Sequence, residues 1–151
     1  MRVTVNDVDL NYEISGNSGK PWLTFSNSLA TNLHMWDFQA EALAKDFRIL
    51  RYDKRGHGES QAVAGPYTFE DLVNDIVGLW DELGIEQSHF VGLSIGGMTA
   101  QGIMLSNPER LKSVVIANSM GKIAPEFVGA WQERITLSSE QGMGPLVQPT
   151  M

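Results

Sequence analysis

The order of apolar and polar residues along the chain predicts alternating strands and helices. Short apolar or alternating runs typical of β-strands occur at 2–5, 10–14, 22–25, 47–52, 89–91 and 111–117. Apolar residues at helical spacing occur at 35–44, 69–83, 95–106 and 125–140. The first two strands predict an antiparallel hairpin. The later alternation predicts an α/β fold, in which helices cover both faces of a mostly parallel sheet.

The helix at 69–83 has the clearest ends. Thr68 occupies the N-cap position, and Asp71 follows three residues later, which predicts a capping box with Asp in place of Glu. Gly84 provides the stop at the other end.

The strand at 111–117 bears on whether the sheet is complete. Its sequence, LKSVVIA, is typical of an interior parallel strand, yet no later run resembles a strand. As the last strand it would expose an apolar edge, which proteins normally avoid. Either the helix at 125–140 or a neighbouring subunit covers this edge, or the sheet is incomplete and further strands come from elsewhere.

Composition narrows the classes of partner and cofactor. The 151 residues carry a formal net charge of −7 and no clustered run of Lys or Arg, so neither nucleic acid nor a membrane surface is expected as a partner. An acidic substrate would therefore need a local cation. There is no Cys, and the three His residues lack metal-ligand spacing, so no metal and no other cofactor are expected. No apolar run approaches the ~18 residues of a membrane span, so a cytoplasmic location is expected.

The stretch GLSIG at 92–96 has the form G-x-S-x-G and lies between a predicted strand and a predicted helix. That context is the one that a nucleophile elbow requires, in which a sharp turn exposes the hydroxyl of Ser94 above the sheet. The turn imposes a backbone strain of about 1–3 kcal/mol. We expect Gly97 and Gly102 to let the helix lie close to the sheet. The alternative is a chance match at a tight turn.

Acyl transfer also needs two N–H donors for the developing oxyanion, and removal of one typically costs about 3 kcal/mol. The N–H of Ile95 lies at the start of the predicted helix, where the helix dipole favours negative charge. Leu29, in the polar loop FSNSLAT at 25–31, is the candidate for the second donor. The alternative is a polar loop with no catalytic role.

His57 is a candidate for the base that would activate Ser94. It lies between Gly56 and Gly58, however, and this context is typical of a turn. We interpret His57 as structural, with Asp53 and Arg55 free to pair locally.

Several segments together resemble the α/β-hydrolase fold, and most closely its 3-oxoadipate enol-lactonase branch. They are YDKRGHGES at 52–60, SNSLAT at 26–31 with Met35-Trp36, GPYT at 65–68, and GLSIGG at 92–97. The resemblance runs from the first strand to about Gly144. It implies that Ser94 is the nucleophile and that the N–H groups of Leu29 and Ile95 form the oxyanion hole.

The resemblance also implies that residues 1–119 are the N-terminal part of the hydrolase core and that 120–151 begin a helical cap. A similar cap contains W-x-x-R, here Trp131 and Arg134. These two are candidates for substrate binding, with Arg134 pairing with a substrate carboxylate. The alternative is a solvated Arg134 that pairs with Glu126 or Glu133.

In such enzymes the triad acid usually follows the seventh strand and the His follows the eighth. This chain has Asn118 and Ser119 after its sixth strand, and strands 7 and 8 are missing. Since a serine without its base is a weak nucleophile, the resemblance predicts a complementary C-terminal polypeptide that carries the Asp and the His. The isolated chain is expected to be inactive.

The predicted function is that of a serine hydrolase acting on a small-molecule ester or enol-lactone. The alternatives are a carboxylesterase, a perhydrolase or a C–C bond hydrolase of the same fold, or a non-catalytic fragment or pseudoenzyme. Serine at the elbow argues against dehalogenases and epoxide hydrolases, which carry Asp there.

Overall fold

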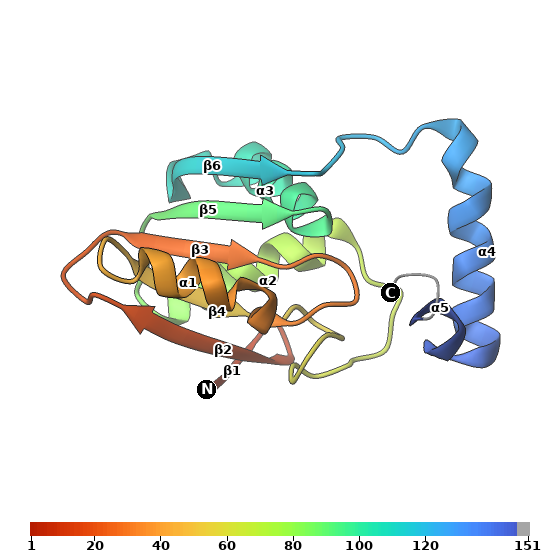
Figure 1. The fold of residues 1–151 in the computed structure, drawn as a ribbon, viewed down its shortest axis with the longest axis horizontal. Helices are drawn as coiled ribbons and strands as arrows, with labels where there is room; N and C mark the ends of the chain where they lie inside the picture. Colours follow the sequence, from red (N-terminus) through yellow and green to blue (C-terminus); the bar gives the residue numbers. More distant parts are fainter. Residues whose placement is uncertain (148–151) are drawn as a thin grey trace. The chain divides into compact units, whose positions relative to one another are not determined.

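Six strands form one sheet in the order β1-β2-β4-β3-β5-β6 in the computed structural model, which describes residues 1–147 (Figure 1). The strands are β1 (Arg2–Val5), β2 (Val8–Gly16), β3 (Trp22–Ser26), β4 (Arg48–Tyr52), β5 (Ser88–Leu93) and β6 (Leu111–Ala117). β1 pairs with β2 and β2 with β4 in antiparallel register, whereas β4, β3, β5 and β6 run parallel. The predicted hairpin and the predicted mostly parallel sheet are both confirmed.

The helices follow the predicted positions. They are α1 (Asp37–Leu43), α2 (Phe69–Glu82), α3 (Ile95–Ser106), α4 (Pro125–Gln141) and α5 (Gly144–Val147), with the short 3₁₀ turns η1 (Leu33–Trp36) and η2 (Pro108–Arg110). The short helix α5 was not expected, because two glycines and Pro145 suggested a break there. Pro145 lies in the first turn of α5, where its missing N–H has no intrahelical acceptor in any case.

Helices lie on both faces of the sheet (Figure 1), and two apolar clusters pack between the helices and the sheet. On one face, Ile76 and Trp80 of α2 and Ile103 of α3 pack with Leu50 and Phe90 of the sheet. On the other face, η1 and α1 pack against residues of β3 and β4, and the rings of Phe25 and Trp36 stack with centroids 4.7 Å apart. The prediction of helices on both faces is therefore confirmed.

The capping box predicted for α2 is present. Thr68 Oγ1 accepts a hydrogen bond from the Asp71 N–H, and the Asp71 carboxylate accepts one from the Thr68 N–H. These bonds hold the pKa of Asp71 below its usual value. The N-terminus of α2 is thus determined by four consecutive residues, as local sequence predicted.

Strand β6 pairs only with β5 and forms one edge of the sheet. Two of its large apolar side chains are exposed, Val115 by 54% and Ile116 by 41%. Within residues 1–147 no strand follows β6. The chain divides into one compact unit from Met1 to Met120 and a second from Gly121 onward.

The second unit contains α4 and α5, which contact each other. Pro125 begins α4, and Gly142, at φ 73°, ends it. The apolar side chains of α4 are largely exposed, among them Phe127, Val128 and Ile135. Across the described part of the chain, no helix combines the length and the apolar character needed to cross a bilayer.

Candidate active site

Ser94 stands at the sharp turn between β5 and α3. Its backbone has φ 54° and ψ −115°, a positive φ that residues with a side chain rarely adopt, at a cost of about 1–3 kcal/mol. Two contacts with the end of β6 hold this turn. The Ser94 N–H donates to the Ala117 carbonyl (3.0 Å), and the Ser119 hydroxyl donates to the Ser94 carbonyl (2.8 Å). The predicted strand–turn–helix context is present.

The glycines around Ser94 allow the turn to be this tight. A Cβ on Gly92 would lie 2.2 Å from the Gly96 carbonyl oxygen, and a Cβ on Gly96 would lie 2.1 Å from the Ser26 carbonyl oxygen. Neither position tolerates a side chain. The first turn of α3 therefore lies directly against the end of β3, where the loop that contains Leu29 begins.

The two glycines farther along α3 differ in role. A Cβ on Gly97 would meet Ser119 and Ile116, so Gly97 lets α3 approach β6 as predicted. A Cβ on Gly102 would instead lie 2.5 Å from Val73 Cγ2 of α2. The prediction that Gly102 serves packing against the sheet is therefore wrong, because this glycine lets two helices approach each other.

The two predicted oxyanion donors both carry free N–H groups. The Ile95 N–H lies in the first turn of α3, where a helix has no internal acceptor. The Leu29 N–H donates to no group among residues 1–147. Neither group is taken by a protein acceptor in the described residues, so both are available to water or to a ligand.

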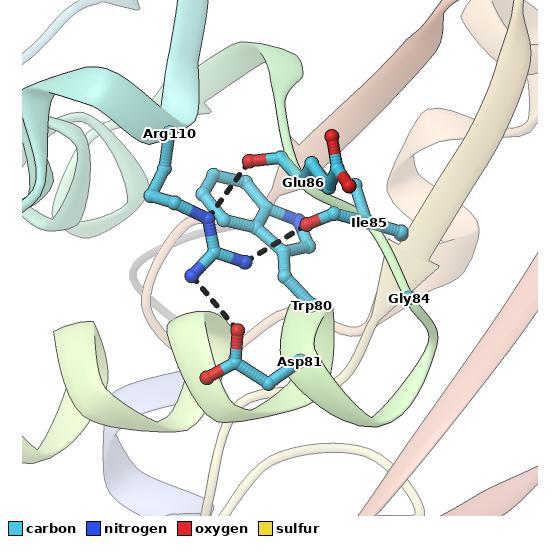
Figure 2. Close-up of a pocket in the computed structure, with 6 residues that line it drawn as sticks. All are labelled: Trp80, Asp81, Gly84, Ile85, Glu86 and Arg110. Carbon is cyan, nitrogen blue, oxygen red and sulfur yellow. Dashed lines mark hydrogen bonds and ion pairs between the residues drawn. The ribbon is translucent and has the colours of Figure 1, made fainter.

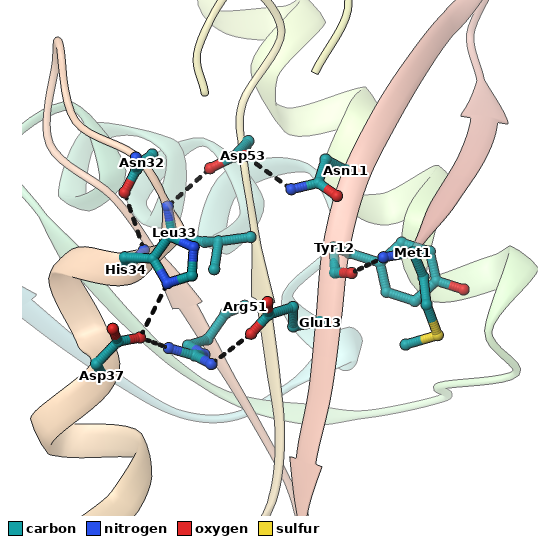
Figure 3. Close-up of polar contacts among 10 residues, drawn as sticks. All are labelled: Met1, Asn11, Tyr12, Glu13, Asn32, Leu33, His34, Asp37, Arg51 and Asp53. Atoms are coloured by element: carbon teal, nitrogen blue, oxygen red, sulfur yellow. Dashed lines mark hydrogen bonds and ion pairs between the residues drawn. The ribbon is translucent and has the colours of Figure 1, made fainter. Parts of the chain in front are cut away.

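The loop from Asn27 to Leu33 is tied at several points. Met35 Sδ accepts from the Ser28 N–H (3.4 Å) and the Thr31 hydroxyl (3.2 Å). Figure 3 shows the carboxylate of Asp53 accepting the Leu33 N–H (2.7 Å) and the side-chain amide of Asn11 (2.9 Å). The loop thus has a defined conformation even though Leu29 itself is exposed.

Nearby, the buried side chain of Arg51 in β4 lies between two acids (Figure 3). It donates to Glu13 of β2 (2.6 Å) and to Asp37 at the start of α1. Its proximity holds the pKa of Asp37 below the usual value for Asp. These contacts fix η1 and α1 beside the loop.

Each of the three histidines has its ring directed to a partner other than Ser94. His57 Nδ1 lies 3.0 Å from the Arg55 carbonyl, within the turn predicted for it. His34 pairs with Asp37, and His89 with Ser113. Among residues 1–147 no histidine or carboxylate bonds to the Ser94 hydroxyl.

Asp53 and Arg55 do not pair with each other as expected. Arg55 forms a bidentate, buried ion pair with Asp75 of α2 (2.6 and 2.7 Å). Asp53 instead accepts backbone and amide N–H groups, including the N–H of Glu59 (3.0 Å). The residues next to Arg55 in the sequence gave no indication that it pairs with Asp75, which lies 20 positions away in α2.

Trp131 and Arg134 lie together on α4, with the Arg134 guanidinium 5.1 Å from the centroid of the Trp131 ring. Both side chains are exposed. Neither of the ion pairs considered from the sequence, with Glu126 or Glu133, is formed by Arg134 in the described residues. The structure therefore leaves this guanidinium free to meet an anion.

A pocket of about 400 Å³ lies elsewhere and contains none of the predicted site residues (Figure 2). Across it, Arg110 pairs with Asp81 Oδ1 (2.8 Å) and donates to the carbonyls of Ile85 and Glu86 (2.8 Å each). Each of the three guanidinium nitrogens of Arg110 thus has a partner within the protein. We interpret this pocket as a structural clamp between α2 and the start of β6.

Sequence reasoning missed two residues next to Ser94 and Leu29. Ser119 was noted only as unable to serve as the triad acid, yet it holds the Ser94 turn. Lys54 was passed over within YDKRGHGES, yet it is only 1% exposed, and its Nζ donates to the Asn27 carbonyl at 2.5 Å. Burial lowers the pKa of Lys54 to about 7, although the adjacent Asp53 charge opposes this shift. A lysine flanked by charged residues is expected to be exposed, and nothing in the sequence indicated that Lys54 is buried.

A family model described as the alpha/beta hydrolase fold matches residues 21–150. The chain belongs to the α/β-hydrolase family. Within this family it is similar to enol-lactonases. It is 42% identical over 146 residues to 3-oxoadipate enol-lactonase 2 of Acinetobacter baylyi, an alignment that covers 97% of this chain and 54% of that protein.

Solved structures agree with this placement. An enol-lactonase from Burkholderia xenovorans LB400 superposes with a TM-score of 0.93 at 40% identity, covering 99% of this hydrolase chain and 58% of that one. A structure from a study of carboxylesterases of Nitrososphaera gargenis superposes with a TM-score of 0.88 at 25% identity, covering 98% and 56%. The chain spans about half the length of the relatives it matches. The resemblance stated from the sequence motifs is confirmed.

Proposed function

We propose that this chain carries the nucleophile and oxyanion hole of a serine hydrolase that opens an enol-lactone. Ser94 Oγ attacks the lactone carbonyl carbon and gives its proton to a histidine base. The tetrahedral oxyanion accepts hydrogen bonds from the Leu29 and Ile95 N–H groups. The ring C–O bond then breaks, the leaving oxygen takes the proton, and water hydrolyses the acyl-enzyme at Ser94.

The observation that carries this proposal is the combination of a strained serine with two unpartnered N–H groups. Ser94 has a positive φ, and the turn that contains it packs on the strand end from which the Leu29 loop departs. A fold keeps such backbone strain mainly at functional sites. The two N–H groups have no protein acceptor in the described residues, so they can bind an oxyanion, which supports a role in acyl transfer.

The substrate class rests on the similarity to enol-lactonases at 40–42% identity. The chain's net charge of −7 requires a local cation for an acidic lactone. Arg134, stacked on Trp131 and without an ion pair in the described residues, supports this role. We propose that α4 belongs to a cap that presents Arg134 to a substrate carboxylate.

The base and the acid are proposed to come from a complementary C-terminal polypeptide. No histidine or carboxylate of residues 1–147 bonds to Ser94, and the β6 edge exposes Val115 and Ile116. A further parallel strand on β6 would cover these side chains and bring the next loop to the edge of the sheet where Ser94 lies. Nucleic acid and membranes are not proposed as partners.

The test is labelling of Ser94 by a fluorophosphonate probe, with and without the complementary polypeptide. We expect strong labelling and enol-lactone hydrolysis only with both pieces present, and neither with Ser94→Ala. Absence of labelling with both pieces present would show that the chain is a non-catalytic module. The matched control is Ser18→Ala, which alters an exposed serine in the turn between β2 and β3, outside the proposed site.

A carboxylesterase is the second candidate, since a structure from a carboxylesterase study shares the fold at 25% identity. The two candidate functions differ in the substrate they require: the proposed lactonase binds a substrate carboxylate through Arg134, whereas a carboxylesterase does not need one. Comparison of an acidic enol-lactone with a neutral p-nitrophenyl ester decides between them. Arg134→Gln should raise KM only for the acidic substrate if the lactonase assignment is right.

A further inference from the structure

Lys54 is the most deeply buried of the long charged side chains in the described residues, since Arg51 and Arg55 are each 7% exposed, and the chemistry proposed above does not use it. It lies directly after β4 and is 1% exposed. Burial of an amine is costly unless it makes specific hydrogen bonds. Its Nζ makes one to a protein acceptor, the carbonyl of Asn27 at 2.5 Å, and lies 5.6 Å from the centre of the Tyr52 ring.

That single bond reaches the start of the Leu29 loop. Asn27 is the first residue after β3, and Leu29 follows two residues later. The Asn27 side chain is fully buried, yet neither of its polar atoms has a partner in the described structure. The Asn27 side chain therefore does not fix the loop, and the contact from Lys54 does.

Lys54 does not act alone. The neighbouring residue Asp53 accepts the Leu33 N–H at the other end of the loop (2.7 Å). The Tyr52 hydroxyl lies 2.9 Å from Ser26 Oγ, at the last residue of β3. Three successive side-chain contacts from the end of β4 thus hold the loop, and the first turn of α3 lies against the Ser26 and Asn27 carbonyls.

We infer that Lys54 is a positioning residue of the proposed acyl-transfer site, because its amine holds the Asn27 carbonyl and thereby sets the position of the Leu29 N–H. This inference rests on the proposed function. The amine keeps N–H donors in both its charged and its neutral form, so it can hold the loop on either side of neutral pH. A displacement of about 1 Å of a group that contacts the transition state can cost about 10²-fold in rate.

The test compares Lys54→Met, which keeps the length and removes the donor, with Lys54→Gln, which retains an N–H donor. Lys45→Met is the matched control, since Lys45 is exposed in the same unit. Each variant is assayed with the complementary polypeptide on an enol-lactone. We expect Lys54→Met to lower kcat about 10²-fold with KM changed less than ~3-fold, because the oxyanion forms only after binding. Lys54→Gln should recover part of kcat.

A merely structural role makes a different prediction. Because the buried amine is costly, Lys54→Met should unfold at the same or a higher urea concentration than the wild type while its kcat falls. If Lys54 only stabilised the fold, kcat and stability would fall together. An unchanged kcat, a rise in KM alone, or a parallel loss of stability and kcat would each overturn the inference.

Amide hydrogen exchange provides a readout that does not need activity. In Lys54→Met the two hydrogen-bonded amides of the loop, Ser28 N–H on Met35 and Leu33 N–H on Asp53, should exchange at least ~10-fold faster, while those of α2 keep their wild-type rates. Equal acceleration in α2, or no change in the loop, would contradict the inference. If the wild-type pair shows neither hydrolysis nor labelling, the proposed function is wrong, and loop exchange still decides whether Lys54 holds the loop.

Discussion

Strands β4 and β6 each contain consecutive apolar residues, but their surroundings differ. Ile49 of β4 is fully buried, because β2 and β3 flank the strand and helices cover it. Val115 of β6 is 54% exposed, because β6 has a neighbour on one side only. The comparison shows that burial depends on what lies beside a strand rather than on its residues. The candidate site has the same two kinds of surroundings. Its enclosed part is the Leu29 loop, held from β3 and β4, and its open part is the Ser94 turn, held by the end of β6.

The largest expected effect concerns the open part. The chain alone should hydrolyse an enol-lactone at least ~10⁴-fold more slowly than the chain with the proposed complementary polypeptide, because no histidine among residues 1–147 bonds to Ser94. Initial rates at saturating substrate measure this ratio. Similar rates for the two samples would show that the chain holds a base of its own.

Ion pairs in buried and in exposed surroundings should differ in the same way. Asp75→Asn leaves the buried Arg55 guanidinium without its bidentate partner and should lower the free energy of unfolding by about 3–5 kcal/mol. Asp81→Asn, whose carboxylate is largely exposed, should cost at most about 1 kcal/mol. Urea denaturation of both variants measures the contrast, and equal losses would refute it.

Apolar truncation tests the two strands directly. Ile49→Ala should cost about 2–5 kcal/mol, since it leaves a cavity among buried side chains. Val115→Ala should cost about 0.5 kcal/mol or less, since the exposed part of its side chain loses little. The measurement is again the urea midpoint, at constant m-value. A similar cost at both positions would mean that β6 is covered in solution.

The buried Lys54 predicts a pH dependence. Its pKa is about 7 in the folded chain against an ordinary value of 10.5, so between these values the unfolded state binds more protons. Wild-type stability should therefore rise with pH in this window, by up to about 1.4 kcal/mol per pH unit. Lys54→Met lacks this contribution, so its stability advantage should shrink from pH 7 to pH 9. A constant difference in urea titrations would contradict the shifted pKa.

The smallest effect on stability is expected from Val115→Lys on the β6 edge. The charge should change the unfolding free energy by only about 0.5 kcal/mol, yet it should hinder pairing of this edge with another chain. Sedimentation velocity should show self-association of the wild-type chain alone and less of it in the variant. A monodisperse wild-type monomer would show that the edge is already protected.

Local sequence predicted most of the fold because its signals act over a few residues. The capping box of α2 needs only Thr68 and Asp71, and the elbow at Ser94 needs only the glycines around it and the flanking strand and helix. The short helix α5 and the packing of Gly102 against α2 were missed. The helix α5 was missed because its glycines and Pro145 suggested a break. The role of Gly102 was missed because it depends on a contact with α2, which is distant in sequence.

The candidate site was predicted in part for the same reason. Ser94, Ile95 and Leu29 lie in recognisable segments, and the structure leaves both N–H groups free. The supporting residues could not be predicted. Ser119 reaches Ser94 across 25 positions, and Lys54 reaches Asn27 across 27.

The sequence by itself determined the order of strands and helices, the strained turn at Ser94 and the family, because each follows from periodicity or from short-range sterics. Only the tertiary structure decided that Lys54 is buried against the Asn27 carbonyl and that Arg55 pairs with Asp75. Those outcomes depend on which distant segments come together. A side chain's burial and partners follow from that assembly, which neighbouring residues do not encode.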